Sequence, residues 1–150
     1  AYYQLGNHSK TFQNYKKALE IRPDNIAVLN NYAYYLAVNG KQLKRAYEYS
    51  AKTVAKEPDN PTYLDTFGWI LYLMGRPVEA KSQFKHAMLY GGKESAVILD
   101  HYAEVLYTLG EYDLAFIYWD QAKSADNSEK IQGLSEKIEK RKAELKKGKR

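Results

Sequence analysis

The sequence predicts an all-α protein in which antiparallel helix pairs stack on one another. Three glycines, Gly40, Gly75 and Gly110, are spaced 35 residues apart, as expected for a turn that recurs once in each pair. Apolar residues on both sides of these glycines recur at helical spacing. Since one helix pair cannot bury both of its apolar faces, the pattern predicts several such units in a stack.

The unit at residues 61–95 shows the local signals most clearly. Asn60 is a suitable N-cap, and Pro61 suits the first helical turn because its missing N–H would have no partner there. Gly75 ends this helix where a left-handed residue is needed, and Pro77 begins the next one. The unit is therefore predicted to be two helices joined by a tight turn.

The two helices of this unit carry complementary apolar faces. The first has Leu64, Phe67, Gly68 and Leu71 on one face. The second has Ala80, Phe84 and Ala87 on the face expected to pack against it. The small residues allow the two backbones to approach closely, while the larger side chains fill the remaining space.

The same positions recur in the neighbouring units. The aromatic–small pair of the first helix occurs as Tyr32-Ala33, Phe67-Gly68 and Tyr102-Ala103, and the second helices repeat Ala46, Ala80 and Ala115. This period and pattern resemble the tetratricopeptide repeat, which implies a right-handed superhelix of helix pairs. The segments 29–36, 64–72 and 101–110, followed by Trp119, also resemble the arrays of bacterial cell-envelope proteins, often lipoproteins.

The repeats divide the chain into an array at 1–127 and a final segment at 128–150. The array consists of a partial repeat at 1–25 and repeats at 26–60, 61–95 and 96–127. In the partial repeat we expect Gly6 to be the turn and the second helix to cover Ser9 to Ile21, so the chain is expected to be a fragment or a processed form. Ser128 is expected to cap a C-terminal helix that reaches about Lys147. This capping helix would place Ile131, Leu134, Ile138 and Leu145 on one face.

The positive charge lies at the C-terminal end. Residues 1–127 contain 14 basic and 14 acidic residues, whereas residues 128–150 contain 9 basic and 4 acidic ones, which accounts for the net charge of +5. Such a tail could bind anionic lipid or nucleic acid. Acidic residues interrupt it, however, and no aromatic residues are present for base stacking, so a solvated helix end is the favoured interpretation.

The resemblance implies that the first helix of each repeat lines a concave groove. The residues at its groove positions form a row of polar side chains and two rows that are mainly aromatic. They are Asn30, Tyr34, Asp65, Trp69, Tyr72, Asp100, Glu104 and Tyr107, with Ala37 at a ninth position. Aromatic rings beside carboxylates can hold a neutral-to-basic, partly apolar segment. The spacing is equally consistent with Trp69 and Tyr72 packing against neighbouring repeats.

The sequence offers little for catalysis. The three histidines, His8, His86 and His101, do not form a metal-binding spacing, and the chain has no cysteine and no phosphate-binding glycine loop. The basic clamp for a carboxyl terminus that some relatives carry is also absent. We therefore predict no enzyme activity, no metal and no cofactor.

The favoured function is a protein-interaction scaffold that binds a peptide or protein segment in the groove. Two alternatives remain open. The chain could be a structural part of a longer array that associates with itself, or its basic tail could bind an anionic partner. No segment is apolar enough to span a membrane. The partner and the compartment stay undetermined, and the bacterial cell envelope is what the closer resemblance implies.

Overall fold

The computed structural model describes residues 5–22, 24–40 and 42–148. Within these ranges all regular secondary structure is helical. In chain order the helices are α1 (Leu5–Ile21), α2 (Ile26–Val38), α3 (Leu43–Lys56), α4 (Pro61–Leu73), α5 (Pro77–Leu89), the short 3₁₀ helix η1 (Gly92–Glu94), α6 (Ala96–Thr108), α7 (Tyr112–Ser124), the 3₁₀ helix η2 (Ser128–Lys130) and α8 (Leu134–Gly148).

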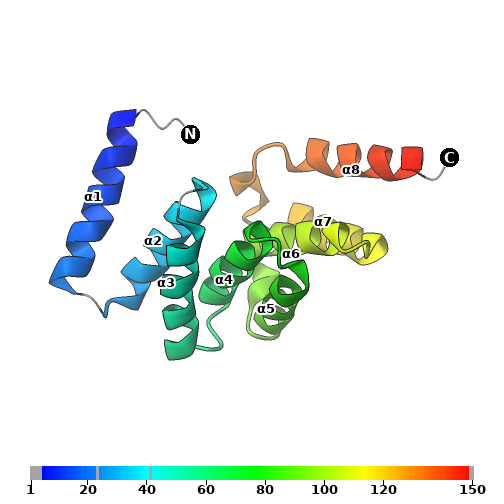
Figure 1. The fold of residues 1–150 in the computed structure, drawn as a ribbon. Coiled ribbons are helices and arrows are strands. Elements are labelled where there is room, and N and C mark those ends of the chain that lie inside the picture. Colours follow the sequence, from blue (N-terminus) through cyan, green and yellow to red (C-terminus); the bar gives the residue numbers. More distant parts are fainter. Residues whose placement is uncertain (1–4, 23, 41, 149–150) are drawn as a thin grey trace.

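The helices form a curved row of pairs (Figure 1). Helices α2 and α3, α4 and α5, and α6 and α7 pack as hairpins, and each second helix of the first two pairs also contacts the first helix of the next pair. The first helices α2, α4 and α6 contact one another in succession. Helix α1 lies at one end of the row and α8 at the other. This is the predicted α-solenoid with a C-terminal capping helix.

Each first helix begins at a polar cap, and the caps recur with the repeat. Asn25 accepts a hydrogen bond from the backbone N–H of Val28, and Ser95 accepts one from that of Ile98. Asn60 accepts from the N–H groups of both Thr62 and Tyr63, as its position predicts. These bonds satisfy donors that the first turn of a helix leaves without a partner.

The turns inside the pairs depend on left-handed glycine. Gly40, Gly75 and Gly110 have φ of +66°, +78° and +83°, and a Cβ at any of them would meet no atom within 4 Å. Backbone conformation therefore requires glycine here, rather than lack of space. After the second of these turns, the Arg76 N–H reaches back to the carbonyl of Leu71 at 2.9 Å, which closes the helix end.

The core is built around the second helices. Phe84 of α5 and Trp119 of α7 occupy equivalent positions and are both 0% exposed. The corresponding residue of α3 is Ser50, and there the interior is filled by tyrosine rings instead. For example, Tyr15 of α1 stacks on Tyr32 of α2 with ring centroids 5.6 Å apart.

The first helix starts earlier than the sequence predicts. The sequence predicts a turn at Gly6 and a helix start at Ser9, but α1 runs without a break from Leu5 to Ile21. A single glycine costs a helix only about 1 kcal/mol relative to alanine, so it does not end one by itself. The part of this prediction that concerns residues 1–4 lies outside the described residues.

The last helix starts later than predicted. Ser128 does not cap it; residues 128–130 form η2, and α8 begins only at Leu134. Gly133 precedes α8 with φ of +69°, and this left-handed residue redirects the chain. The redirection places Leu134 and Ile138 in the core, where they are 5% and 1% exposed.

Candidate partner-binding groove

The eight predicted groove residues lie on α2, α4 and α6, and they differ in accessibility. Four polar ones are buried: Asn30, Asp65, Asp100 and Glu104 are 4–8% exposed. The aromatic ones remain more accessible, since Tyr34 is 37% exposed and Trp69, Tyr72 and Tyr107 are half-buried. The surface is therefore made of aromatic rings above a layer of buried polar groups. Ala37, at the ninth position, is itself buried.

Trp69 and Tyr72 belong to a stack of rings that joins α4 to α6. The indole of Trp69 lies flat on the imidazole of His101, with centroids 4.1 Å apart and planes inclined by 18°. Tyr72 also stacks on Trp69, at 4.8 Å, and its hydroxyl lies 3.0 Å from the Thr108 hydroxyl. Packing within the stack fixes the rings, while part of Trp69 and of Tyr72 remains accessible.

Asp65 holds this stack through His101. Its Oδ1 lies 2.7 Å from His101 Nδ1, and both residues are buried. The sequence alone indicates no role for His101. A periodic signal existed, because His101 follows Asp65 by 36 residues, the same separation that joins Tyr72 to Thr108. The two residues therefore link consecutive first helices.

Removing this carboxylate should destabilise the fold. We expect Asp65→Ala to lower the free energy of unfolding by about 1–3 kcal/mol, because the buried His101 N–H loses its acceptor. Asp65→Asn keeps an acceptor oxygen and should lose clearly less. Urea unfolding followed by circular dichroism measures both, and equal stability of Asp65→Ala and the original chain would contradict the assigned contact.

At the α6 end, the predicted groove residues are in contact with α8. Asp100 accepts hydrogen bonds from Lys137 Nζ at 2.7 Å and from Trp119 Nε1 at 2.8 Å. The carboxylate of Glu104 pairs with Lys137 at 3.1 Å and with Arg141 at 3.0 Å. This third of the predicted groove is covered by the chain itself.

Burial and charge act in opposite directions on the cations of α8. Burial alone would lower the pKa of Lys137, but hydrogen bonding to Asp100 and the charges of Asp100 and Glu104 outweigh it, so this pKa is raised. In the same way Glu104 and Glu144 outweigh burial and raise the pKa of Arg141. A raised lysine pKa adds stability that is complete below the ordinary lysine value and is lost only as pH rises through the raised one. The ion pairs therefore persist at neutral pH.

Asn30 differs from its counterparts in the later repeats. It is 4% exposed, and its side-chain oxygen has no hydrogen-bond partner among the described residues. The equivalent Asp65 and Asp100 are both paired with the following helix of their face. At this polar position, Asp65 and Asp100 therefore link to the next first helix or its equivalent, whereas the side-chain oxygen of Asn30 does not.

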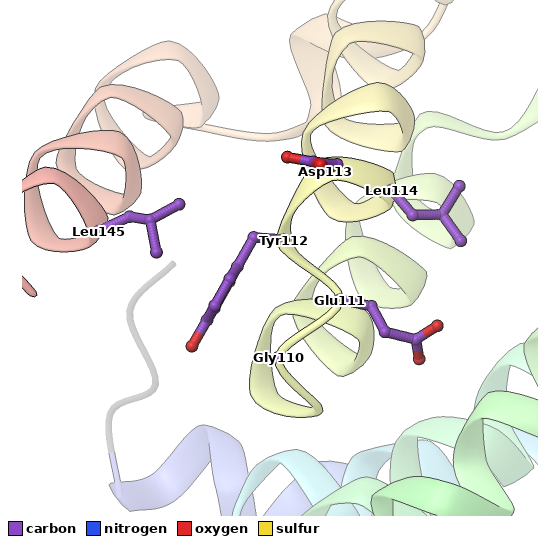
Figure 2. Close-up of a pocket in the computed structure, with 6 residues that line it drawn as sticks. All are labelled: Gly110, Glu111, Tyr112, Asp113, Leu114 and Leu145. Carbon is purple, nitrogen blue, oxygen red and sulfur yellow. The ribbon is translucent and has the colours of Figure 1, made fainter. Parts of the chain in front are cut away.

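The described part of the chain contains open surface cavities. One of about 410 Å³ lies where α7 begins, between Tyr112 and Leu145 of α8 (Figure 2). No cluster of three or more potential metal ligands occurs among the described residues. His86 Nε2 lies 2.7 Å from Asp59 Oδ1 at the surface, which brings together two potential ligands and not three. No helix in the described ranges is both long and apolar enough to cross a membrane.

These features define a helical-repeat protein of the α-solenoid class whose first helices present an aromatic and acidic face. Residues 14–47 match the model of the tetratricopeptide repeat family. One tetratricopeptide repeat is therefore identified at residues 14–47. No protein of curated function matches the sequence.

Solved structures share the fold of the chain. A thermophilic tetratricopeptide repeat protein of Thermus thermophilus aligns over 91% of this chain and 74% of its own, with a TM-score of 0.73 and 16% identity. The type IV pilus biogenesis factor PilW aligns over 81% of this chain with a TM-score of 0.71 and 18% identity, and PilF of Pseudomonas aeruginosa over 77% with 0.63 and 25%. The chain spans 56% of PilW and 52% of PilF.

Proposed function

We propose that this chain is a non-enzymatic scaffold that binds a protein or peptide segment on the face formed by α2, α4 and α6. Tetratricopeptide repeats are in general protein-interaction scaffolds. The observation that carries the proposal is the stack of Tyr72, Trp69 and His101, in which accessible rings are fixed by the buried Asp65 contact. Rigid aromatic side chains contribute much of the binding energy at interfaces because little freedom remains to be lost on binding.

The chemistry of this face indicates the type of segment. Its rings offer apolar anchoring and attract cations, and the carboxylate of Asp65 lies beside them. The carboxylates of Asp100 and Glu104 are paired with Lys137 and Arg141, so they do not add free negative charge. The bound segment should therefore be neutral to basic and partly apolar. The likeness to PilW, a type IV pilus biogenesis factor, is consistent with the bacterial cell-envelope location that the closer resemblance implies.

Selection from a random peptide library displayed on phage tests the proposal. Peptides selected on the original chain should be rich in apolar and basic residues. Trp69→Ala with Tyr72→Ala should weaken the selected peptides by about 2 kcal/mol or more, which is about 30-fold. Tyr90→Ala removes a 48% exposed ring from the end of α5 and should leave affinity unchanged. The proposal fails if both variants bind like the original chain.

Self-association is the second candidate. Val78 and Leu89 of α5 and Ile117 of α7 are 68%, 77% and 52% exposed, so the second helices carry apolar side chains that the described chain does not cover. Light scattering over a range of concentrations distinguishes a dimer from a monomer. Binding of an anion by the basic tail is the weakest candidate, because Lys137 and Arg141 are already paired with carboxylates.

A further inference from the structure

Helix α8 occupies the place of a first helix in a further repeat. Asp65 contacts His101 36 residues later, and Asp100 contacts Lys137 37 residues later. Likewise Tyr72 reaches Thr108 across 36 residues, and Tyr107 contacts Glu144 across 37. The face of α6 thus receives α8 with nearly the register in which α4 receives α6.

The interior contacts of α8 are nevertheless sparse. Among the described residues of α8 only Leu134 and Ile138 are buried, whereas ten described residues of α6 are buried. Its other end stands off from α7, where Leu145 and Tyr112 face each other across the open cavity (Figure 2). Burial of apolar surface therefore attaches α8 along only its first turns.

Charge provides the rest of the attachment. Lys137 and Arg141 pair with Asp100 and Glu104, as described above, and the same two cations lie over aromatic rings. Lys137 Nζ is 5.9 Å from the centroid of Trp119, and the Arg141 guanidinium carbon is 4.8 Å from that of Tyr107. Each cation therefore meets both a carboxylate and a ring, the two groups that best attract it.

We propose that α8 is an internal ligand: it covers a binding surface on α6 and α7 that accepts, in its place, a basic amphipathic helix of a partner protein. The surface consists of Asp100, Glu104, Tyr107 and Trp119. Helix α8 shows what fits it, namely aliphatic side chains at positions i and i+4 with Lys or Arg at i+3 and i+7. This inference rests on the proposed function, since the surface continues the same face beyond Trp69 and Tyr72.

The tether makes α8 a strong competitor. A helix joined by a short linker is present at an effective concentration on the order of millimolar, so a partner helix with equal contacts binds weakly until α8 is released. The apparent affinity equals the intrinsic affinity multiplied by the fraction of molecules whose surface is uncovered. Weakening α8 should therefore strengthen binding of an external helix.

A fluorescent peptide of residues 131–148 serves as the probe, measured by anisotropy against full-length chains. In the released variant, Lys137→Glu with Arg141→Glu, the tethered helix is repelled by Asp100 and Glu104, and the peptide should bind at least about tenfold more tightly than to the original chain. A matched control, Lys140→Glu with Lys146→Glu, makes the same charge change at exposed positions and should behave like the original. Raising the salt concentration should weaken binding to the released variant.

Two further measurements keep the outcome decisive. Lys137→Gln with Arg141→Gln removes the attraction without adding repulsion and should also bind the peptide more tightly than the original, so a folding defect of the first variant does not end the test. A peptide with Glu at both positions should not bind. Circular dichroism verifies that each variant is folded.

The proposal is overturned if folded variants and the original chain bind the peptide equally, or if none binds it. A concentration-dependent dimer of the original chain that disappears in the released variant would also overturn it, because α8 of a second copy would then be the occupant. Trp69→Ala with Tyr72→Ala should leave peptide binding intact. Failure of the library selection alone therefore refutes only the proposed function.

Discussion

Trp119→Ala is expected to lower the free energy of unfolding by about 3–5 kcal/mol, the range for removing a large aromatic side chain from a core. Trp119 is 0% exposed, and its ring packs against Phe116 and Tyr107 with centroids 5.5 and 5.9 Å away. Its indole N–H also donates to buried Asp100, which would lose this donor and keep Lys137. Urea unfolding followed by circular dichroism measures the loss.

Trp119→Phe separates the two contributions. It keeps most of the ring volume and removes the N–H donor, so it should lose less stability than Trp119→Ala. Because Lys137 still donates to Asp100, that carboxylate stays paired. A Trp119→Ala chain as stable as the original would contradict the position of this ring in the core.

Gly68→Val is expected to have the next largest effect, near the upper end of about 1–3 kcal/mol for overpacking a core. A Cβ at position 68 would lie 2.8 Å from Phe84 Cε2 and 3.1 Å from two further ring carbons. Phe84 is 0% exposed, so its ring cannot move into solvent to make room. The turn glycines differ, because there only the backbone conformation demands glycine.

A double-mutant cycle tests the cause. Phe84→Ala alone creates a cavity and destabilises the chain, but combined with Gly68→Val it provides space for the new side chain. The double variant should lose clearly less than the sum of the two single losses. Gly148→Val, with no atom near its added Cβ, should be nearly neutral. Additive losses would show that Phe84 is not what excludes a side chain at position 68.

The assignment of α8 as an internal ligand changes how the groove is understood. Asn30, Tyr34, Asp65, Trp69 and Tyr72 lie on α2 and α4, whereas α8 pairs with α6. Asp100, Glu104 and Tyr107 of α6 are in contact with it. The face therefore has an accessible part and a part that becomes available only when α8 leaves.

The sequence by itself determined the repeating elements of this protein. The cap at Asn60, the left-handed turn at Gly75 and the pairing of small residues with Phe84 and Trp119 all follow from signals within one repeat. Such signals depend on backbone geometry and on which face of a helix is apolar, and both are local properties. Two local predictions were wrong. The turn expected at Gly6 does not form, because a single glycine costs a helix only about 1 kcal/mol. The cap expected at Ser128 does not form, because the left-handed Gly133 delays the last helix until Leu134.

Only the tertiary structure decided which distant groups meet. Helical spacing places Asp65, Trp69 and Asp100 on one face, but it does not reveal that Asp65 pairs with His101 or that Trp69 stacks on it. It also does not show that the basic residues of α8 return to the carboxylates of α6. These contacts join residues about one repeat apart, and their formation depends on how the repeats curve and on where the left-handed Gly133 directs the chain.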